Sequence, residues 1–198
     1  MTPATVFIVD DDAAVRDGLG MLCEVHGLSV ECHDSAESFL GAYQPAQQGC
    51  LVLDVRMGGM SGPELHAELS RRGSLLPVIY LSGHGDIPLS VRAMLAGAVN
   101  FLTKPVNSDE LLTCLRRVLR EGERRQIHAL RLAELSAREQ EVMALAIEGL
   151  SNKEIARRLE ISHRTVEIHK RRVFQKTGTT SLLELARLAT DQGSVDTR

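Results

Sequence analysis

The sequence contains no tryptophan, and aromatic residues make up only 3% of its 198 positions. Proteins that bind single-stranded nucleic acids stack bases on aromatic side chains, so we do not expect this class. No hydrophobic run approaches the roughly 20 residues that a membrane-spanning helix needs. Residues 1–12 also lack the basic and apolar segments of a signal peptide. We therefore expect a soluble, cytoplasmic protein with no membrane partner.

Cysteine is scarce and scattered. The four cysteines, at positions 23, 32, 50 and 114, show none of the paired spacings that bind zinc. They lie among apolar residues, which predicts reduced thiols in the core of a cytoplasmic protein.

The length suits one large domain or two small ones. The net charge is only −3, but the charges are unevenly distributed. Residues 1–123 carry 9 Lys and Arg against 16 Asp and Glu, whereas residues 124–198 carry 14 against 10. This asymmetry indicates two modules with different partners. The acidic module is the candidate for binding a metal cation, and the basic module is the candidate for binding a polyanion.

The first 121 residues alternate between short apolar runs and segments with helical periodicity. Strands are expected at residues 4–9, 28–33, 50–54, 77–81 and 99–102, and helices after each of them. The first helix, which begins near residue 13, carries an apolar series at helical spacing: Val15, Leu19, Leu22 and Val25. Five such units predict an α/β domain with a parallel sheet and helices on both faces.

Asp54 ends the most continuous apolar run of the chain. Taken alone, it is as typical of a turn or helix N-cap aspartate as of a functional carboxylate. However, Asp10 and Asp11 follow another expected strand, Ser82 a third and Lys104 a fourth. The carboxyl ends of parallel strands meet at one edge of a sheet, so these side chains are expected to converge there.

The chemistry of these residues suggests phosphoryl transfer. Asp10, Asp11 and Asp54 supply the hard oxygen ligands that Mg²⁺ prefers. An ionised carboxylate can attack phosphorus and form an aspartyl phosphate without a general base. Ser82 would donate a hydrogen bond to the phosphoryl oxygens, and the Lys104 ammonium would neutralise their charge.

Four clusters together resemble a response-regulator receiver domain over residues 1 to about 122. They are Asp10-Asp11-Asp12, the segment from Asp54 to Gly62, Ser82-Gly83-His84-Gly85, and Phe101-Leu102-Thr103-Lys104-Pro105. The resemblance implies a flavodoxin-like fold with strand order 2-1-3-4-5 and places the phosphoacceptor at Asp54. It also implies that Mg²⁺ is held by Asp10, Asp11, Asp54 and the backbone carbonyl of Arg56.

The resemblance further implies a switch pair, Ser82 and Phe101, that moves when Asp54 is phosphorylated. Three departures from the family pattern stand out. Gly58 occupies a position where the family usually has proline, Ser82 replaces the commoner threonine, and Phe101 replaces the frequent tyrosine. Arg56 and His84 flank the site and could tune acyl-phosphate hydrolysis, although His84 is also typical of a solvated loop residue.

Residues 122–133 are charged and rich in helix-forming residues, which predicts a helical linker in which Gly122 could be a break. Four short helices are expected within residues 134–198. Ser136 with Glu139, and Ser151 with Glu154, have the spacing of capping boxes at the first two. The third helix begins at Ser162, and the fourth spans residues 182–189. The short connection between the second and third helices favours a helix-turn-helix.

Residues 151–176 contain eight basic residues against three acidic ones. Such a cluster can be merely a solvated face, but the third helix also exposes a mixed series suited to the major groove of DNA. That series is Arg164, Glu167, Ile168 and Arg171. The expected phosphate contacts are Asn152, Lys153, Thr165 and Lys170.

Three segments resemble the LuxR-type helix-turn-helix over residues 134–190. They begin at Leu135, Gly149 and Ser162. With the receiver-like half, the chain is similar to two-component transcriptional regulators of the NarL/FixJ family. The resemblance implies that Glu167, Ile168 and Arg171 face the bases, and that residues 182–189 form a dimer helix. Glu167 stands where some relatives carry lysine, so the operator cannot be inferred from them.

The resulting hypothesis is a transcription factor, not an enzyme, that accepts a phosphoryl group on Asp54, dimerises and binds promoter DNA. The implied partners are a sensor histidine kinase, double-stranded promoter DNA, a second copy of the chain and, as a further candidate, RNA polymerase. A haloacid-dehalogenase-type phosphohydrolase uses similar groups, but it needs an acid at position 56, where this chain has arginine. A serine hydrolase is disfavoured because this chain lacks, two residues before Ser82, the glycine that a nucleophile elbow uses. A regulator that binds DNA without phosphorylation stays open.

Overall fold

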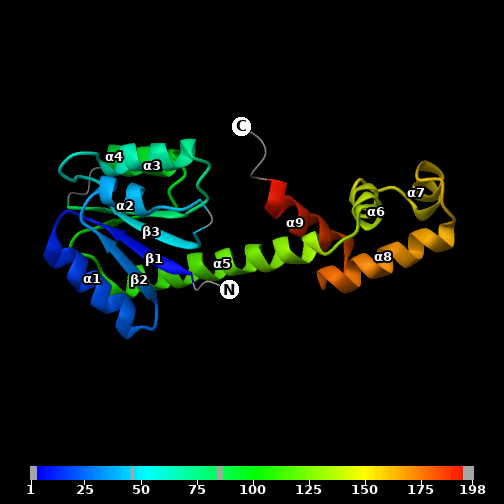
Figure 1. Ribbon diagram of the computed structural model, residues 1–198, viewed down its shortest axis with the longest axis horizontal. Helices are drawn as coiled ribbons and strands as arrows, with labels where there is room; N and C mark the ends of the chain where they lie inside the picture. Colours follow the sequence, from blue (N-terminus) through cyan, green and yellow to red (C-terminus); the bar gives the residue numbers. More distant parts are fainter. Residues whose placement is uncertain (1–3, 46, 84–86, 194–198) are drawn as a thin grey trace. The chain divides into compact units, whose positions relative to one another are not determined.

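The computed structural model describes residues 4–45, 47–83 and 87–193 (Figure 1). By its internal contacts the chain divides into two compact units, Met1–Gly122 and Glu123–Arg198, which are taken separately below. Within the described residues, no helix combines the length and the apolar composition needed to cross a lipid bilayer.

The N-terminal unit is built on a five-stranded sheet. Its strands pair in the order β2-β1-β3-β4-β5, and every pairing is parallel. This order confirms the predicted 2-1-3-4-5 topology. The strands begin and end within one residue of the predicted positions: β1 Thr5–Val9, β2 Ser29–His33, β3 Gly49–Asp54, β4 Val78–Ser82 and β5 Asn100–Thr103.

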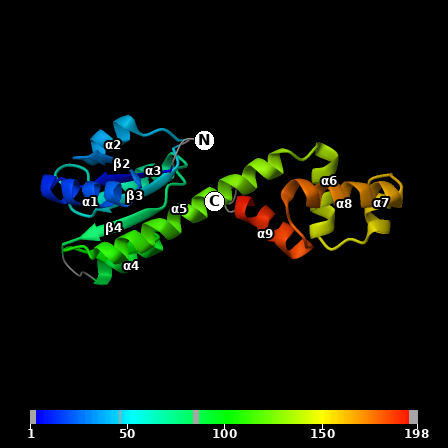
Figure 2. The same ribbon diagram turned by 90° about the horizontal axis from the view of Figure 1, so that it is seen from below.

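Helices cover both faces of this sheet (Figures 1 and 2). One hydrophobic cluster joins the sheet to α1 (Ala13–Val25) and α5 (Ser108–Ala133). A second joins the opposite face to α2 (Ala36–Ala42), α3 (Gly62–Arg71) and α4 (Ile87–Leu95). Successive side chains of a strand point to opposite faces, so Val6 and Ile8 enter the first cluster and Phe7 and Val9 the second. Both faces being buried explains why these strands are continuously apolar.

Side-chain caps determine where several helices begin. Asp12 accepts hydrogen bonds from the backbone N–H groups of Ala14 and Val15, and thereby caps α1. Ser35 caps α2 by accepting from Ser38 N at 3.2 Å. Such caps satisfy N–H groups that have no partner inside the helix.

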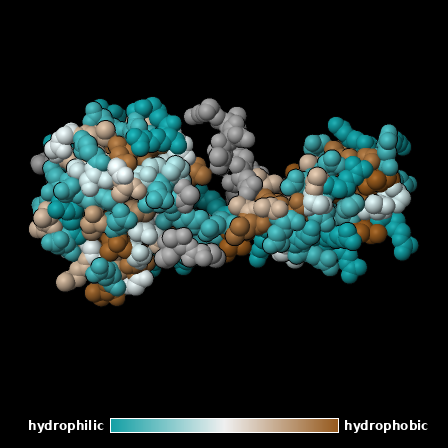
Figure 3. Space-filling view, viewed as in Figure 1, coloured by the Kyte–Doolittle hydropathy of each residue, from teal (hydrophilic) through white to brown (hydrophobic). Residues whose placement is uncertain are grey.

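One prediction about burial in this unit is wrong, and part of the apolar series of α1 is exposed. Val25, part of the apolar series of α1, is 77% exposed, and the neighbouring Met21 is 69% exposed. Figure 3 shows hydrophobic surface at the lower edge of this unit, over the end of α1. Cys32 is exposed instead of buried, because it lies on β2, the edge strand. All four cysteines are free thiols, and the other three are buried.

The C-terminal unit contains α6 (Ala137–Ile147), α7 (Asn152–Arg158), α8 (His163–Thr177) and α9 (Leu182–Gly193). The capping boxes predicted at Ser136 and Ser151 are both present, and Ser162 caps α8. Gly149 and Gly178 have positive φ angles of 91° and 69°, so glycine suits the turns that follow α6 and α8. The last helix starts where predicted but extends to Gly193.

The segment predicted as a linker is helical throughout, and it forms the last turns of α5 without a break at Gly122. Its end packs within the C-terminal unit. Leu132 is only 8% exposed and belongs to a core cluster with Leu135 and Val173. The Arg131 guanidinium donates to the Thr177 carbonyl at 3.1 Å. This packing depends on side chains distant in sequence, which periodicity alone cannot reveal.

Candidate functional site

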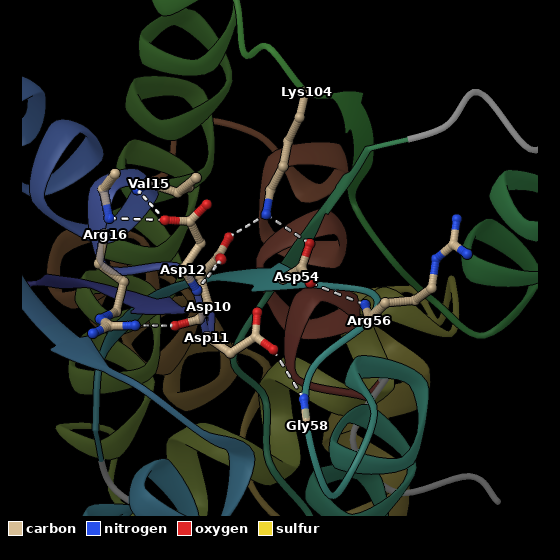
Figure 4. Close-up of polar contacts among 10 residues, drawn as sticks. Asp10, Asp11, Asp12, Val15, Arg16, Asp54, Arg56, Gly58 and Lys104 are labelled. Atoms are coloured by element: carbon tan, nitrogen blue, oxygen red, sulfur yellow. Dashed lines mark hydrogen bonds and ion pairs between the residues drawn. The ribbon is translucent and has the colours of Figure 1, made fainter.

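The carboxylates of Asp10, Asp11 and Asp54 converge at the carboxyl edge of the sheet (Figure 4). Each offers one oxygen atom, and these atoms all lie within 4.8 Å of one another. Asp10 follows β1 and Asp54 ends β3, and these two strands are neighbours in the sheet. Asp10 and Asp54 are buried, whereas Asp11 is exposed. A parallel sheet thus brings together residues that are more than 40 positions apart, as predicted.

Lys104 reaches the same place from the segment after β5. Its Nζ atom lies 2.6 Å from Asp10 Oδ2 and 2.9 Å from Asp54 Oδ1. Burial alone would lower the pKa of Lys104, but its hydrogen bonds to the two carboxylates outweigh burial and raise that pKa. The lysine is therefore held as an ammonium ion between two buried acids.

Burial has a stronger effect on Asp54. Desolvation raises the pKa of this carboxyl, and the charge of Asp10 adds to that effect, while contacts with Lys104 and the Arg56 N–H act against it. The net direction is upward, so one ammonium ion does not fully compensate the carboxylates packed at this edge.

Backbone N–H groups hold all three carboxylates (Figure 4). Asp12 N donates to Asp10 Oδ1, Arg56 N to Asp54 Oδ2 and Gly58 N to Asp11 Oδ2, each at 3.0 Å. The Arg56 guanidinium points away from the carboxylates (Figure 4). The donor set consists of carboxylate oxygens with open positions, which fits Mg²⁺.

Of the other residues predicted for this site, Ser82 lies at the same edge of the sheet and Phe101 lies near it. Ser82 ends β4 and is buried, and its backbone carbonyl accepts from Lys104 N at 2.7 Å. Phe101 is half-buried on β5 opposite Tyr80 and packs against the cluster that includes α4. His84 lies outside the described residues.

Several residues at this edge were not predicted from the sequence. Asp12 caps α1, Arg16 donates to the Asp10 carbonyl at 2.7 Å, and Glu37 accepts from Met60 N at 3.0 Å. Only the cap had a sequence signal, namely an aspartate directly before a helical pattern. The contacts of Arg16 and Glu37 join residues through the fold, so no local pattern identifies them.

In the C-terminal unit, α7 and α8 form the predicted helix-turn-helix. Ile155 and Val166 are fully buried and pack in one cluster with Val142 of α6. The opposite side of α8 faces outward. All four residues predicted to enter the major groove are exposed: Arg164, Glu167, Ile168 (45%) and Arg171.

The predicted phosphate-contacting residues lie beside that surface. Lys153 is exposed, whereas Asn152, Thr165 and Lys170 are half-buried. Lys170 Nζ donates to Asn152 Oδ1 at 3.0 Å and so connects α8 to the start of α7. Asn152, Lys170, Glu167 and Arg171 also line a shallow groove on this side of the unit.

Comparison with known proteins supports both halves. The family model of the response regulator receiver domain matches residues 6–116. The model of bacterial regulatory proteins of the luxR family matches residues 133–189.

The similarity to individual proteins extends over nearly the whole chain. The transcriptional regulatory protein FixJ of Bradyrhizobium diazoefficiens is 42% identical over 202 residues, covering 98% of each chain. The C4-dicarboxylate transport transcriptional regulatory protein DctR of Rhodobacter capsulatus is 45% identical over 193 residues, covering 93% of this chain and 98% of DctR. The solved structure of full-length FixJ from B. japonicum has a TM-score of 0.58 and 41% identity, covering 98% of this chain and 99% of that chain.

Proposed function

Because the chain belongs to the NarL/FixJ family of two-component response regulators, we propose that phosphorylation of Asp54 controls its binding to promoter DNA. The protein is a transcriptional response regulator with a receiver half and a LuxR-type DNA-binding half. We assign residues 1–121 to the receiver, 122–133 to the linker and 134–198 to the DNA-binding domain. The proposed compartment is the cytoplasm, where promoter DNA is accessible.

The observation that carries the proposal is the convergence of Asp10, Asp11, Asp54 and Lys104 at one sheet edge. An Asp54 oxygen would attack the phosphorus of a phosphohistidine on a sensor kinase. The new O–P bond forms as the N–P bond breaks, and the imidazole leaves with the bonding electrons. No general base is needed when the attacking carboxylate is ionised, and the contacts of Asp54 with Lys104 and the Arg56 N–H favour that form.

Asp10, Asp11, Asp54 and the Arg56 carbonyl would hold Mg²⁺. When bound, this ion would offset the repulsion between the carboxylates and the incoming phosphoryl oxygens. Lys104 would shift its contact from Asp54 to a phosphoryl oxygen, which keeps its ammonium paired. Ser82 would donate its hydroxyl to another phosphoryl oxygen, and Phe101 would turn inward as Ser82 moves.

Receiver pairing is the proposed link to DNA. Helix α4 exposes three apolar side chains: Val91 (51%), Met94 (49%) and Leu95 (83%). Exposed apolar residues on one helix favour association with a second copy, here through α4 and β5. Two tethered DNA-binding domains on two half-sites gain avidity, so modest pairing produces a large change in promoter occupancy. Arg164, Glu167, Ile168 and Arg171 would face the bases, with Asn152, Lys153, Thr165 and Lys170 toward the phosphates.

The test is to incubate the purified protein with phosphoramidate and Mg²⁺ and to follow its intact mass. We expect one phosphoryl group per chain, dependent on Mg²⁺ and absent from Asp54→Asn. The matched control, Asp34→Asn, removes an exposed carboxylate of the same unit and should be phosphorylated normally. Continuous release of inorganic phosphate over many turnovers would instead indicate a phosphohydrolase and contradict the proposal.

A further inference from the structure

The loop between β3 and α3 is held by two carboxylates from other parts of the receiver unit. Gly58 N donates to Asp11 Oδ2, and Met60 N donates to Glu37 Oε1, both at 3.0 Å. Asp11 follows β1, whereas Glu37 lies in the first turn of α2. The loop that follows Asp54 is therefore connected both to a candidate metal ligand and to a helix on one face of the sheet.

The contact with Asp11 requires a backbone N–H at position 58. Gly58 does not have a positive φ angle, and a Cβ atom added there would meet nothing within 4 Å. An ordinary side chain therefore fits at this position. Proline, the usual residue of the family here, would not preserve the contact, since its nitrogen carries no hydrogen, so the bond to Asp11 is a property of this chain and not of the family. The relevant property of residue 58 is thus its N–H donor and not the conformational freedom of glycine.

Asp11 needs such a partner more than the other two acids do. Asp10 and Asp54 are buried at the ends of strands, so packing restricts their side chains. Asp11 is exposed, and an exposed side chain samples several rotamers unless a contact selects one. In Figure 4 one oxygen of Asp11 contacts Gly58, while the other is directed toward Asp10 and Asp54. The Gly58 N–H thus selects the orientation that completes the carboxylate cluster.

Glu37 holds the next part of the same loop. Glu37 Oε1 accepts from Met60 N and also lies close to Gly59. A Cβ atom added at Gly59 would be only 3.0 Å from this oxygen. Gly59 also has a φ angle of +86°, which is strained for other residues. The loop is thus closely packed against the Glu37 carboxylate, and this contact positions the Gly58 N–H that Asp11 accepts.

We propose that Gly58, through its backbone N–H, and Glu37, through the loop, are positioning groups for the metal ligand Asp11. Neither would touch the ion or the phosphoryl group. Partners of this kind orient a ligand, and their loss typically lowers metal affinity about 10- to 100-fold. This inference rests on the proposed function, since it assumes that Asp11 binds Mg²⁺.

The test compares Mg²⁺ affinity in two pairs of full-length variants by calorimetry. Gly58→Pro removes the N–H and should weaken Mg²⁺ binding about tenfold, whereas Gly58→Ala keeps the N–H and should match the parent. Glu37→Ala removes the acceptor for Met60 and should weaken binding by a smaller factor. Glu37→Gln keeps an acceptor oxygen and should restore the parental affinity, a rescue that a general loss of stability would not show.

Amide NMR spectra give a readout independent of affinity. In the parent and in Gly58→Ala, the residue-58 amide should stay protected from exchange when Mg²⁺ is added. Equal Mg²⁺ affinity in Gly58→Pro, Gly58→Ala and the parent would overturn the role of Gly58. Equal affinity in Glu37→Ala and Glu37→Gln would overturn that of Glu37. If the parent itself failed to bind Mg²⁺, the proposed function would fail as well, so the two failures are distinguishable.

Discussion

Two lysine–carboxylate contacts, one in each unit and each with a buried carboxylate, have opposite effects on the pKa of that carboxylate. Lys104 lies 2.9 Å from Asp54, and Lys176 lies 2.6 Å from Glu139. Burial raises the pKa of Asp54 despite its lysine, with a second acid, Asp10, beside it. In contrast, the hydrogen bond from Lys176, assisted by the Ser136 backbone N–H, lowers the pKa of Glu139 to about 2.

The difference separates the proposed phosphoryl-acceptor site from a structural contact. Glu139 accepts from both the Lys176 ammonium and the Ser136 N–H and, among the described residues, has no second acid sharing that lysine. Its contact with Lys176 joins α6 to the end of α8. Asp54 shares one ammonium with Asp10, so its site gains stability from any further positive charge. The residues proposed to contact DNA lie on the outer side of α8, whereas two of the three carboxylates proposed to bind the metal are buried in the receiver unit.

The largest expected effect concerns Lys104. Replacement of Lys104 by alanine leaves Asp10 and Asp54 without their cation, so the Mg²⁺-free protein should lose about 3–5 kcal/mol of unfolding free energy in urea. Adding Asp54→Asn to Lys104→Ala should recover much of that loss by removing one of the two charges. Mg²⁺ should still bind to Lys104→Ala, and phosphorylation should no longer cause dimerisation. If Lys104→Ala alone were as stable as the parent, Lys104 would not compensate the two buried acids. If it dimerised normally on phosphorylation, Lys104 would not couple phosphorylation to dimerisation.

The second prediction is that replacing Arg171 lowers DNA affinity without changing the stability of the fold. Arg171 is exposed on the outer side of α8, so Arg171→Ala should leave unfolding unchanged. Its DNA binding should weaken by about 1–3 kcal/mol, with relaxed preference at one base step. Arg172→Ala removes the same charge from the next position around the helix and should weaken binding without altering sequence preference. The measurement is selection of bound sequences from a random DNA pool with each variant. If Arg171→Ala kept the parental sequence preference, Arg171 would not face the bases.

The smallest effect is a pH dependence of stability in the helical unit. Because the pKa of Glu139 lies below its usual value of 4.5, its contribution is complete above about pH 4.5 and is lost as the pH falls toward about 2. The stability contribution of Asp54 has the opposite pH dependence. Because its pKa is raised, this contribution is present at low pH and is lost as the pH rises through that pKa.

Glu139→Gln should therefore cost about 1 kcal/mol at neutral pH and progressively less in acid. Glu141→Gln changes an exposed carboxylate of the same helix and should have little effect at any pH. Urea unfolding of both variants at several pH values provides the comparison. A cost for Glu139→Gln that is independent of pH would mean that the charge of Glu139 does not stabilise the unit.

Much of the fold could be predicted from the sequence because its signals are local. The buried strands are continuously apolar, and Ser136 and Ser151 each precede a glutamate by three residues, so pattern and spacing locate these elements. The convergence of Asp10, Asp54 and Lys104 was also predictable, since parallel strands place their carboxyl ends at one edge.

The remaining features depend on contacts between distant segments. Val25 continues the apolar periodicity of α1 and yet is 77% exposed, so periodicity alone does not establish which side chains the sheet covers. Leu132 belongs to the core of the C-terminal unit although its surroundings in sequence are charged. The bond from Gly58 to Asp11 joins residues 47 positions apart through a backbone group, which no residue pattern encodes.

The most direct test of the central claim measures promoter binding before and after phosphorylation. A DNA fragment selected from genomic DNA by the phosphorylated protein would be titrated with the parent and with Asp54→Asn, each with and without phosphoramidate and Mg²⁺. Phosphorylation should tighten binding of the parent by a factor on the order of 10² and leave Asp54→Asn unchanged. Equal tightening of both proteins, or of neither, would contradict the proposal that Asp54 controls DNA binding.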